Sequence, residues 1–271
     1  MKKIFSIFFI IGIFIFGSFV GCSGNSSDKD GKEKNLKVGA AVTPHAEILE
    51  HIKPKLKEEG INLEIITLDS EDQLNPALAD KQIDANYFQH TPYLESVSKE
   101  KGYDFEVAGK IHIEPIGFYS NTIKSISELK NGDKIGIPNN PSNEFRALKL
   151  LEKYGVIKLK DGITDYSATP SDIAENPKNI NFVELEAATL PRALADLSGA
   201  IINTNIVIEA GLSPDDAIVK EDSDSPYANI IAVRKGDEER EDIKKLIEIL
   251  QSDDVKKFLK DKYGSAIVPA F

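Results

Sequence analysis

From residue 36 onward, short apolar runs alternate along the chain with longer segments in which apolar residues recur every three or four positions. Runs such as 134–137 and 199–202 are typical of strands that are buried on both faces. The spacing in segments such as 45–56 predicts amphipathic helices that bury one side. Strands that alternate with helices predict an α/β fold, in which mainly parallel sheets are covered by helices on both faces.

The expected elements follow one another in that alternating order. Strands are expected at 36–42, 62–68, 83–87, 134–137, 181–185, 199–202 and 229–233, and in two segments of 105–119 that break near Gly109 and Pro115. Helices are expected at 45–56, 76–80, 91–101, 143–154, 189–197, 239–251 and 254–263. Pro54 should kink or split the first of these helices, and Ser142 is the expected N-cap of the helix at 143–154.

The folded part of the chain is long enough for two lobes, each with a core of its own. We expect residues 36–120 and 230–271 to form the first lobe, and residues 121–229 to form the second. The chain would then cross between the lobes near Ser120 and near Ala228. Composition marks neither crossing, because no Pro- or Gly-rich linker is present there.

The first 21 residues have the pattern of a secretory signal peptide. Two lysines precede an apolar stretch at 4–20, which ends in small residues. A membrane-spanning anchor is the alternative, but the stretch is at the short limit of the roughly 20 residues that such a helix needs. The sequence Phe19-Val20-Gly21-Cys22 resembles a bacterial lipobox, although Leu is usual where Phe19 stands. We therefore expect cleavage after residue 21 and a diacylated Cys22 that holds the protein at the membrane, facing outside the cytoplasm.

A polar segment follows Cys22. Residues 23–34 are rich in Gly, Ser and charged side chains and contain no apolar residue. Such a segment cannot bury enough surface to become ordered, so we expect residues 22–35 to be a flexible tether.

Composition and motifs argue against several functional classes. The 44 acidic residues against 33 basic ones, with a net charge of −11, argue against nucleic-acid binding. One Cys excludes an intrachain disulfide and any site made of several thiolates. The four His show no metal-ligand spacing, and no nucleophile, phosphate-binding or dinucleotide motif is present. We therefore expect no catalytic residue, no metal and no cofactor, and an extracellular enzyme stays an unsupported alternative.

Three segments combine polar and aromatic residues at the ends of expected strands, where ligands bind in open α/β sheets. Residues 84–93 contain three aromatic side chains, a His and several amides or acids. Arg146, near the start of a helix, is suited to a bidentate contact with a carboxylate. Asn203 directly follows the apolar run 199–202.

Four segments carry a family resemblance that spans nearly all of the chain after residue 35. They are DANYFQHTPYL (84–94), ENPKNINFVELEAATLPRAL (175–194), AIINTNIVIEAGL (200–212) and SPYANIIAVR (225–234). With the lipobox and tether, they identify the chain as a member of the NlpA family of lipoproteins, the substrate-binding proteins of methionine ABC importers. The resemblance implies a two-lobed periplasmic-binding-protein fold of type 2 that closes around its ligand. It also implies an ABC permease and its ATPase as partners.

The resemblance implies roles for individual residues as well. Phe88, His90 and Tyr93 would form the aromatic side of the pocket, which suits a polarisable thioether. Arg146 would hold the α-carboxylate of L-methionine. Two amides would fix its carboxylate and ammonium groups, because each buried charge needs a fixed partner. These amides are Asn203 and Asn229.

Two positions depart from the family pattern. Family members that bind methionine usually have an aromatic residue where this chain has Glu71, and often a small residue where it has Tyr87. Tyr87 could refill the space beside Glu71. Alternatively, Glu71 could change the specificity towards a methionine-containing dipeptide or another, cationic amino acid. A third interpretation is that Glu71 points to solvent.

The leading interpretation is therefore a lipid-anchored protein that captures L-methionine and delivers it to an ABC importer. The alternatives that stay open are a different amino acid in the same role, an extracellular enzyme, and a surface interaction protein that keeps the fold without the ligand.

Overall fold

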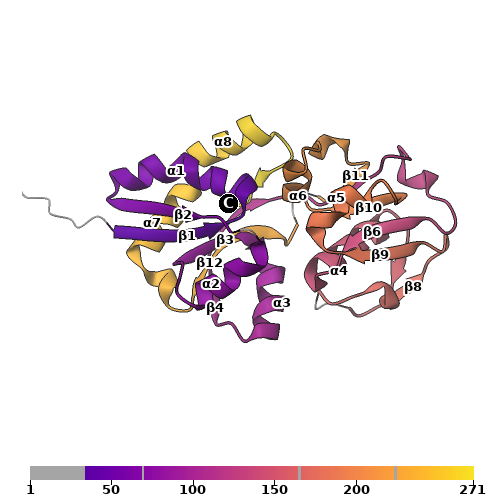
Figure 1. Cartoon of the computed structure of the whole chain (residues 1–271), viewed down its shortest axis with the longest axis horizontal. Coiled ribbons are helices and arrows are strands. Elements are labelled where there is room, and N and C mark those ends of the chain that lie inside the picture. Colours follow the sequence, from indigo (N-terminus) through magenta and orange to yellow (C-terminus); the bar gives the residue numbers. More distant parts are fainter. Residues whose placement is uncertain (1–33, 69, 164–165, 223–224) are drawn as a thin grey trace, which may run out of the picture. The chain divides into compact units, whose positions relative to one another are not determined.

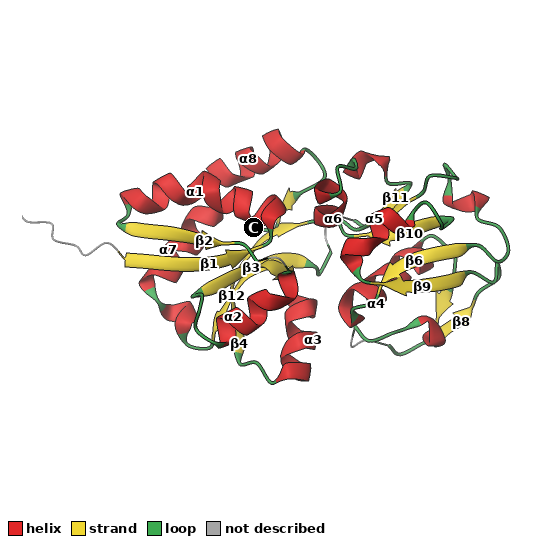
Figure 2. Cartoon of the chain, in the orientation of Figure 1, coloured by secondary structure: helices red, strands yellow, loops and turns green. Residues whose placement is uncertain are grey.

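The structure is a computed structural model of the chain, and it describes residues 34–68, 70–163, 166–222 and 225–271. The expected signal peptide, Cys22 and the tether up to residue 33 lie outside these described residues. The first strand begins at Lys34, so the expected tether reaches two residues into it. Two mixed sheets, each with helices packed against it, make up the described part of the chain (Figure 1, Figure 2).

The first sheet contains the N-terminal strands and two strands from the end of the chain. Its strands are β1 (Lys34–Ala40), β2 (Ile61–Ile66), β3 (Ala85–His90), β4 (Phe105–Ile113), β12 (Ala228–Arg234) and β13 (Val268–Pro269). They lie in the order β13-β4-β12-β3-β1-β2. β1 is parallel to β2 and β3, whereas β12 is antiparallel to β3 and β4, and β13 is antiparallel to β4.

Helices cover both faces of this sheet. They are α1 (Glu47–Glu58), α2 (Leu74–Ala79), α3 (Thr91–Lys101), α7 (Glu241–Leu250) and α8 (Asp253–Tyr263). α1, α7 and α8 cover one face, and α2 and α3 cover the other (Figure 1). Side chains alternate between the faces along each strand, so Tyr87 packs in the layer under α1 while Phe88 packs in the layer under α2 and α3.

The second sheet is built from the middle of the chain. Its strands are β5 (Gly117–Tyr119), β6 (Lys134–Pro138), β9 (Asn181–Leu185), β10 (Gly199–Ile202) and β11 (Val219–Lys220), in the order β11-β5-β10-β6-β9. β6 is parallel to β9 and β10, and β5 is antiparallel to β10 and β11. The strands β7 (Lys158–Leu159) and β8 (Ile173–Glu175) form a separate antiparallel pair.

This second sheet also has a core on each face. Its helices are α4 (Pro141–Lys153), α5 (Leu190–Ala193) and α6 (Thr204–Glu209). Phe118 and Ile201 pack on the face covered by α4, and Tyr119 and Ile202 pack on the face covered by α5 and α6. Single helical turns complete the structure: η1 (Val42–Ala46), η2 (Glu71–Gln73), η3 (Ile126–Glu128), η4 (Pro170–Asp172), η5 (Ala187–Thr189), η6 (Pro214–Asp216) and η7 (Asp237–Glu239).

The chain passes from the first sheet to the second between Ile113 and Gly117, and it returns between Lys220 and Ala228. The lobe boundaries expected at residues 120 and 229 stay a prediction. Strand pairing places β5 in the second sheet, so the change of sheet comes before residue 117 rather than near Ser120.

Both sheets are mixed, so the expectation of mainly parallel sheets is wrong. Two of the three antiparallel pairs in the first sheet involve β12, which returns from the second sheet and lies between β3 and β4, and the third joins β13 to β4. Parallel pairing requires a crossover connection, usually a helix, within one sheet. β12 arrives from the second sheet and not by a crossover within the first, so it is free to pair antiparallel with β3 and β4.

Local expectations about breaks and caps also fail at three places. α1 continues through Pro54 as one element, because its apolar face at Ile48, Ile52 and Leu56 is fully buried. Gly109 lies inside β4, which continues through it, although the register of β4 with β12 shifts between Gly109 and Val107. The N-cap of α4 is Asn140, not Ser142, and its side chain accepts a hydrogen bond from the backbone N–H of Asn143 at 3.2 Å.

No helix in the described ranges combines the length and apolar character needed to cross a membrane.

Candidate functional site

A cavity of about 340 Å³ is lined by residues of both sheets and their helices and turns, and by Glu114 in the segment that connects β4 to β5. The first sheet and its turns contribute residues on one side, and α4, η5, α6 and the ends of β6 and β10 contribute residues on the other. Its lining residues include His45, Glu71, Phe88, His90, Tyr93, Glu114, Asn143, Arg146, Asn203, Asn205, Glu209 and Asn229. Seven of the eight candidate ligand-binding residues, Glu71 included, therefore line one cavity. The eighth, Tyr87, does not line it.

The aromatic side of the cavity is formed where β3 ends and α3 begins. Phe88 and His90 point to the same side because they are two residues apart on β3. Tyr93 packs edge-on against both rings, at centroid distances of 6.0 Å and 6.2 Å. Nδ1 of His90 accepts a hydrogen bond from the backbone N–H of Tyr93, so this His also caps α3. Burial lowers the pKa of His90 to about 3, and the ring is neutral at neutral pH.

Arg146 is held by the two segments that connect the sheets. Its Nε and Nη2 donate to the Glu221 carboxylate, and Nη2 also donates to the backbone carbonyl of Glu114 at 2.8 Å. The Tyr227 ring lies 4.4 Å from the guanidinium carbon. Arg146 is 3% exposed, and its Nη1 has no hydrogen bond to any described residue. The guanidinium is therefore fixed in place beside the cavity, and its Nη1 is left without a hydrogen bond to the described residues.

Asn203 and Asn143 connect the aromatic side to the second lobe. Oδ1 of Asn143 accepts from Nε2 of His90 at 3.0 Å and from Nδ2 of Asn203 at 3.1 Å. Oδ1 of Asn203 is buried and has no partner among the described residues. A buried acceptor without a donor is costly, and this one lies on the cavity wall. It is therefore suited to receive a donor from a ligand.

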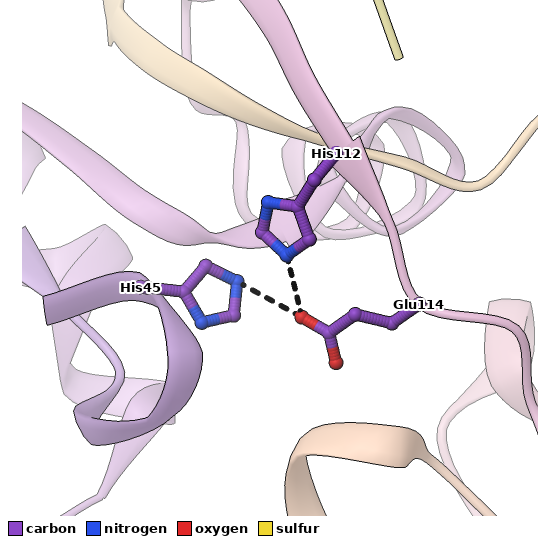
Figure 3. Close-up of side chains that lie close together, drawn as sticks. All are labelled: His45, His112 and Glu114. Carbon is purple, nitrogen blue, oxygen red and sulfur yellow. Dashed lines mark hydrogen bonds and ion pairs between the residues drawn. The ribbon is translucent and has the colours of Figure 1, made fainter. Parts of the chain in front are cut away.

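The floor of the cavity is a cluster of buried titratable groups (Figure 3). Oε1 of Glu114 lies 2.7 Å from Nε2 of His112 and 3.5 Å from Nε2 of His45. Nδ1 of His112 faces the hydroxyl of Tyr87 at 2.5 Å, and Oδ1 of Asn229 lies 3.0 Å from Nε2 of His45. Burial lowers the pKa of His45 to about 4 and that of His112 to about 3. Both rings are therefore neutral at neutral pH and act as hydrogen-bonding groups.

Among the described residues, His45, His112 and Glu114 are the group whose ligand atoms are close enough to hold a metal ion. The spacing of the His residues along the chain does not reveal this cluster, because it assembles only in the fold. The distance of 2.7 Å between His112 and Glu114 is that of a hydrogen bond. The arrangement shown is a hydrogen-bonded network, with each His donating from Nε2.

Glu71 points into the cavity from η2. Nδ2 of Asn205, on α6, donates to its Oε1 at 3.1 Å, so the contact joins residues from the two lobes. Burial, together with the charges of Glu209, Glu114 and Asp72, raises the pKa of Glu71 to about 8. The carboxyl group is therefore mostly protonated at neutral pH. This placement contradicts the interpretation in which Glu71 points to solvent.

Tyr87 does not contribute to the cavity. Its side chain is fully buried in the layer under α1, and its hydroxyl contacts His112. Tyr87 and Phe88 are adjacent on β3 and must face opposite sides, so only one of them can reach the ligand side. The hypothesis that Tyr87 refills the space beside Glu71 is therefore wrong.

Several residues of the site were not expected from the sequence. They are His45, His112, Glu114, Glu209 and Glu221, whereas Asn143 and Asn205 belong to the polar segments 139–146 and 201–205, which follow expected strands. One signal was available: His112 and Glu114 are two residues apart, near the end of an extended segment, and alternation predicts that they share a face. The other contacts join residues far apart in the chain, and no local pattern identifies them.

Carboxylates outnumber cations around the cavity. Asp72, Glu114, Glu186 and Glu209 line it together with Glu71, which is mostly protonated at neutral pH, whereas Arg146 is the one Lys or Arg among its described lining residues. Arg146 is itself paired with Glu221. The cavity therefore favours a ligand that brings a positive group together with any carboxylate.

Comparison with known proteins identifies the family. The profile of the NlpA lipoprotein family matches residues 36–271. The chain belongs to this family. The methionine-binding lipoprotein MetQ of Bacillus subtilis is 43% identical over 258 residues, which cover 93% of this chain and 94% of that protein. The D-methionine-binding lipoprotein MetQ of Escherichia coli K12 is 40% identical over 242 residues, which cover 88% of each chain.

Solved structures of similar proteins have the same fold. A nutrient-binding protein from Burkholderia cenocepacia bound to methionine is 46% identical, with a TM-score of 0.84, and the match covers 87% of this chain and 100% of that one. A periplasmic substrate-binding protein of an ABC transporter from Coxiella burnetii is 44% identical, with a TM-score of 0.83 and the same coverage. The expected two-lobed α/β fold of the NlpA family is confirmed.

Membership in the NlpA family also confirms the class of protein. The chain is a substrate-binding lipoprotein and not an enzyme, and it acts at the membrane, facing outside the cytoplasm.

Proposed function

We propose that this NlpA-family protein captures methionine in the cavity and delivers it to an ABC permease that is driven by an ATPase. The observation that carries the proposal is that aromatic side chains, the guanidinium of Arg146 and the amide of Asn203 line a single cavity. Phe88 and Tyr93 offer aromatic surface to a thioether. Nη1 of Arg146 offers a donor to the α-carboxylate, and Oδ1 of Asn203 offers an acceptor to the ammonium group. Relatives that bind methionine by name support the same ligand.

The roles of the site residues are part of this proposal. Arg146 holds the carboxylate, as the family resemblance implies. Asn203 accepts from the ammonium group. Asn229 acts indirectly, because its Oδ1 and Nδ2 are both bonded to the floor cluster, to His45 and Glu114. Cys22 carries the diacyl anchor, and two acyl chains are sufficient for stable attachment to a membrane.

Binding of methionine is expected to raise the melting temperature of the purified protein. A ligand at about 100 times its Kd adds about 2.7 kcal/mol to the free energy of unfolding. For a chain of this size, that corresponds to about 5–10 °C. Differential scanning fluorimetry with L-methionine, D-methionine, lysine and arginine measures the shift. A shift with lysine or arginine but none with methionine would show that the ligand is a cationic amino acid. The role as a substrate-binding protein would be unaffected.

The protonation state of Glu71 is expected to control which side chain is accepted. Below its pKa of about 8, Glu71 is neutral and is compatible with a thioether; above it, the carboxylate disfavours an apolar neighbour. Affinity for methionine should therefore fall by about fourfold as pH rises from about 6.5 to about 8.5. Isothermal titration calorimetry measures this dependence.

The matched control is Glu71→Gln, which keeps the size and hydrogen-bonding capacity of the side chain but cannot ionise. Its affinity should stay level over the same range. The dependence has the opposite sign for a cationic side chain, because ionised Glu71 attracts it. An affinity that rises with pH in the wild type but not in the Gln variant would favour a cationic amino acid over methionine.

A further inference from the structure

We propose that His45, His112 and Glu114 form a binding site for a divalent transition-metal ion such as Zn²⁺. This inference goes beyond the proposed function, because it gives the protein a second class of ligand and is independent of which amino acid the cavity takes. Two imidazoles and one carboxylate are a ligand set that suits Zn²⁺ and its neighbours in the first transition row.

The three side chains come from different elements and converge on one point (Figure 3). His45 lies in η1, His112 lies in β4, and Glu114 directly follows β4. One nitrogen or oxygen atom of each residue lies within 4.8 Å of the corresponding atoms of the other two. All three residues are buried, so the surrounding packing fixes their side chains in this arrangement.

The separations between these atoms are close to those of a metal centre. Zn²⁺ binds nitrogen and oxygen at about 2.0–2.1 Å, so tetrahedral ligands lie about 3.3 Å apart. Oε1 of Glu114 is 2.7 Å from Nε2 of His112 and 3.5 Å from Nε2 of His45. Oδ1 of Asn229 is 3.0 Å from Nε2 of His45 and offers a further oxygen ligand. An increase of about 0.6 Å in the separation of His112 and Glu114 is enough to admit the ion.

The hydrogen bonds of the cluster convert to metal coordination by a proton shift within each ring. A neutral imidazole binds a metal ion through the nitrogen that carries no proton, so coordination through Nε2 requires the proton to lie on Nδ1. Nδ1 of His112 faces the Tyr87 hydroxyl at 2.5 Å, and a hydroxyl accepts a hydrogen bond as well as donating one. Tyr87 therefore orients His112 from behind, as the outer partners of metal-bound His residues do.

The charges around the site suit a dication. Further carboxylates line the same cavity, and they include Asp72, Glu186 and Glu209. Arg146 is the one Lys or Arg among the described lining residues, and its charge stabilises the ionised form of Glu114 against the effect of burial. The acidic groups of the wall therefore outnumber the basic ones, and a dication lowers the repulsion among them.

The cavity gives a metal ion a route to this site. His45, Glu114 and Asn229 line the cavity, although His112 does not. Three protein ligands of the His₂Glu type leave a coordination position for water or another small ligand. Because His112 and Tyr87 close the buried side, we expect that position on the cavity side.

The test measures Zn²⁺ binding to protein that has been treated with EDTA and then freed of the chelator. Calorimetry on the wild type should show one site with a Kd of about 10 µM or less. Glu114→Gln keeps the size of the side chain and removes its charge. It should weaken binding by about 100-fold or more, because even outer partners of metal ligands change the affinity by about 10- to 100-fold.

His51→Ala provides the matched control. His51 is a partly exposed His on α1 that pairs with Asp254 on α8, away from the cluster. Its removal should change the affinity for Zn²⁺ by less than about threefold. A wild type without binding, or equal affinities for the wild type and Glu114→Gln, would overturn the site and leave adventitious surface binding only.

Co²⁺ gives a second readout that does not depend on whether Glu114→Gln folds. The visible absorption of Co²⁺ is intense when the ion has four or five ligands and weak when it has six. The wild type should give the intense spectrum, and the weak spectrum of the hydrated ion would contradict the assignment. Methionine binding is measured separately on the EDTA-treated protein, so a failure of the proposed function is distinguishable from a failure of the metal site.

Discussion

Replacing Arg146 by Ala is expected to weaken methionine binding by about 100- to 1,000-fold, because the carboxylate of the ligand would enter a buried site without its charged partner. No other Lys or Arg among the described residues lines the cavity, so no neighbour can take over this role. Calorimetry on the folded variant measures the loss. Arg146→Lys should retain part of the affinity, because a lysine keeps the charge but not the planar fork that bonds to Glu221 and Glu114.

The ion pair with Glu221 requires its own control. Arg146→Ala leaves the carboxylate of Glu221, whose side chain is 16% exposed, without a partner, and the variant is expected to melt at a lower temperature. The double variant Arg146→Ala with Glu221→Ala should recover stability but not binding. Binding that recovers along with stability would show that Arg146 acts on the fold and not on the ligand.

Replacing Phe118 by Ala is expected to lower the free energy of unfolding by about 3–5 kcal/mol, a loss at the upper end of the range for a single substitution. Phe118 is fully buried on β5, and its ring lies directly against the backbone of Gly199 on the neighbouring strand. A Cβ at residue 199 would stand 2.2 Å from that ring, so the two positions fit only as a Phe and a Gly. Truncation would leave a cavity in the centre of the second lobe.

Phe182→Ala provides the matched control. Phe182, on β9 of the same sheet, packs against the same core but is only partly buried. Its loss should be about half that of Phe118 or less, because part of its surface already faces water. Urea unfolding followed by circular dichroism measures both variants. Equal losses would show that burial does not distinguish the two positions.

Local sequence patterns predicted the central elements of the fold well. The helix at 91–101 and the strands at 181–185 and 199–202 have the bounds that were expected. Strand alternation and helical spacing depend on neighbours within a few residues, so they can be read without the fold. Short elements such as α6 and β13 were not expected, because they contain too few residues to show a period.

The candidate site was predicted in part, because some of its residues lie at strand ends and helix starts that local patterns reveal. Phe88, His90, Arg146 and Asn203 lie around one cavity because each of them is near the end of a strand or in the first half of a helix that follows one. The direction of Tyr87 was mispredicted, although strand alternation alone places it opposite Phe88. The partners of these residues could not be predicted, because they come from other elements.

The sequence by itself determined the alternation of strands and helices, the family, and about a third of the residues that line the cavity. These follow from residue types and spacings that are local to each segment. Only the tertiary structure decided that the sheets are mixed, that Glu71 meets Asn205 across the cavity, and that His45 and His112 converge on Glu114. The physical reason is that pairing partners, burial and the resulting pKa values depend on contacts between segments more than 60 residues apart, which no local period records.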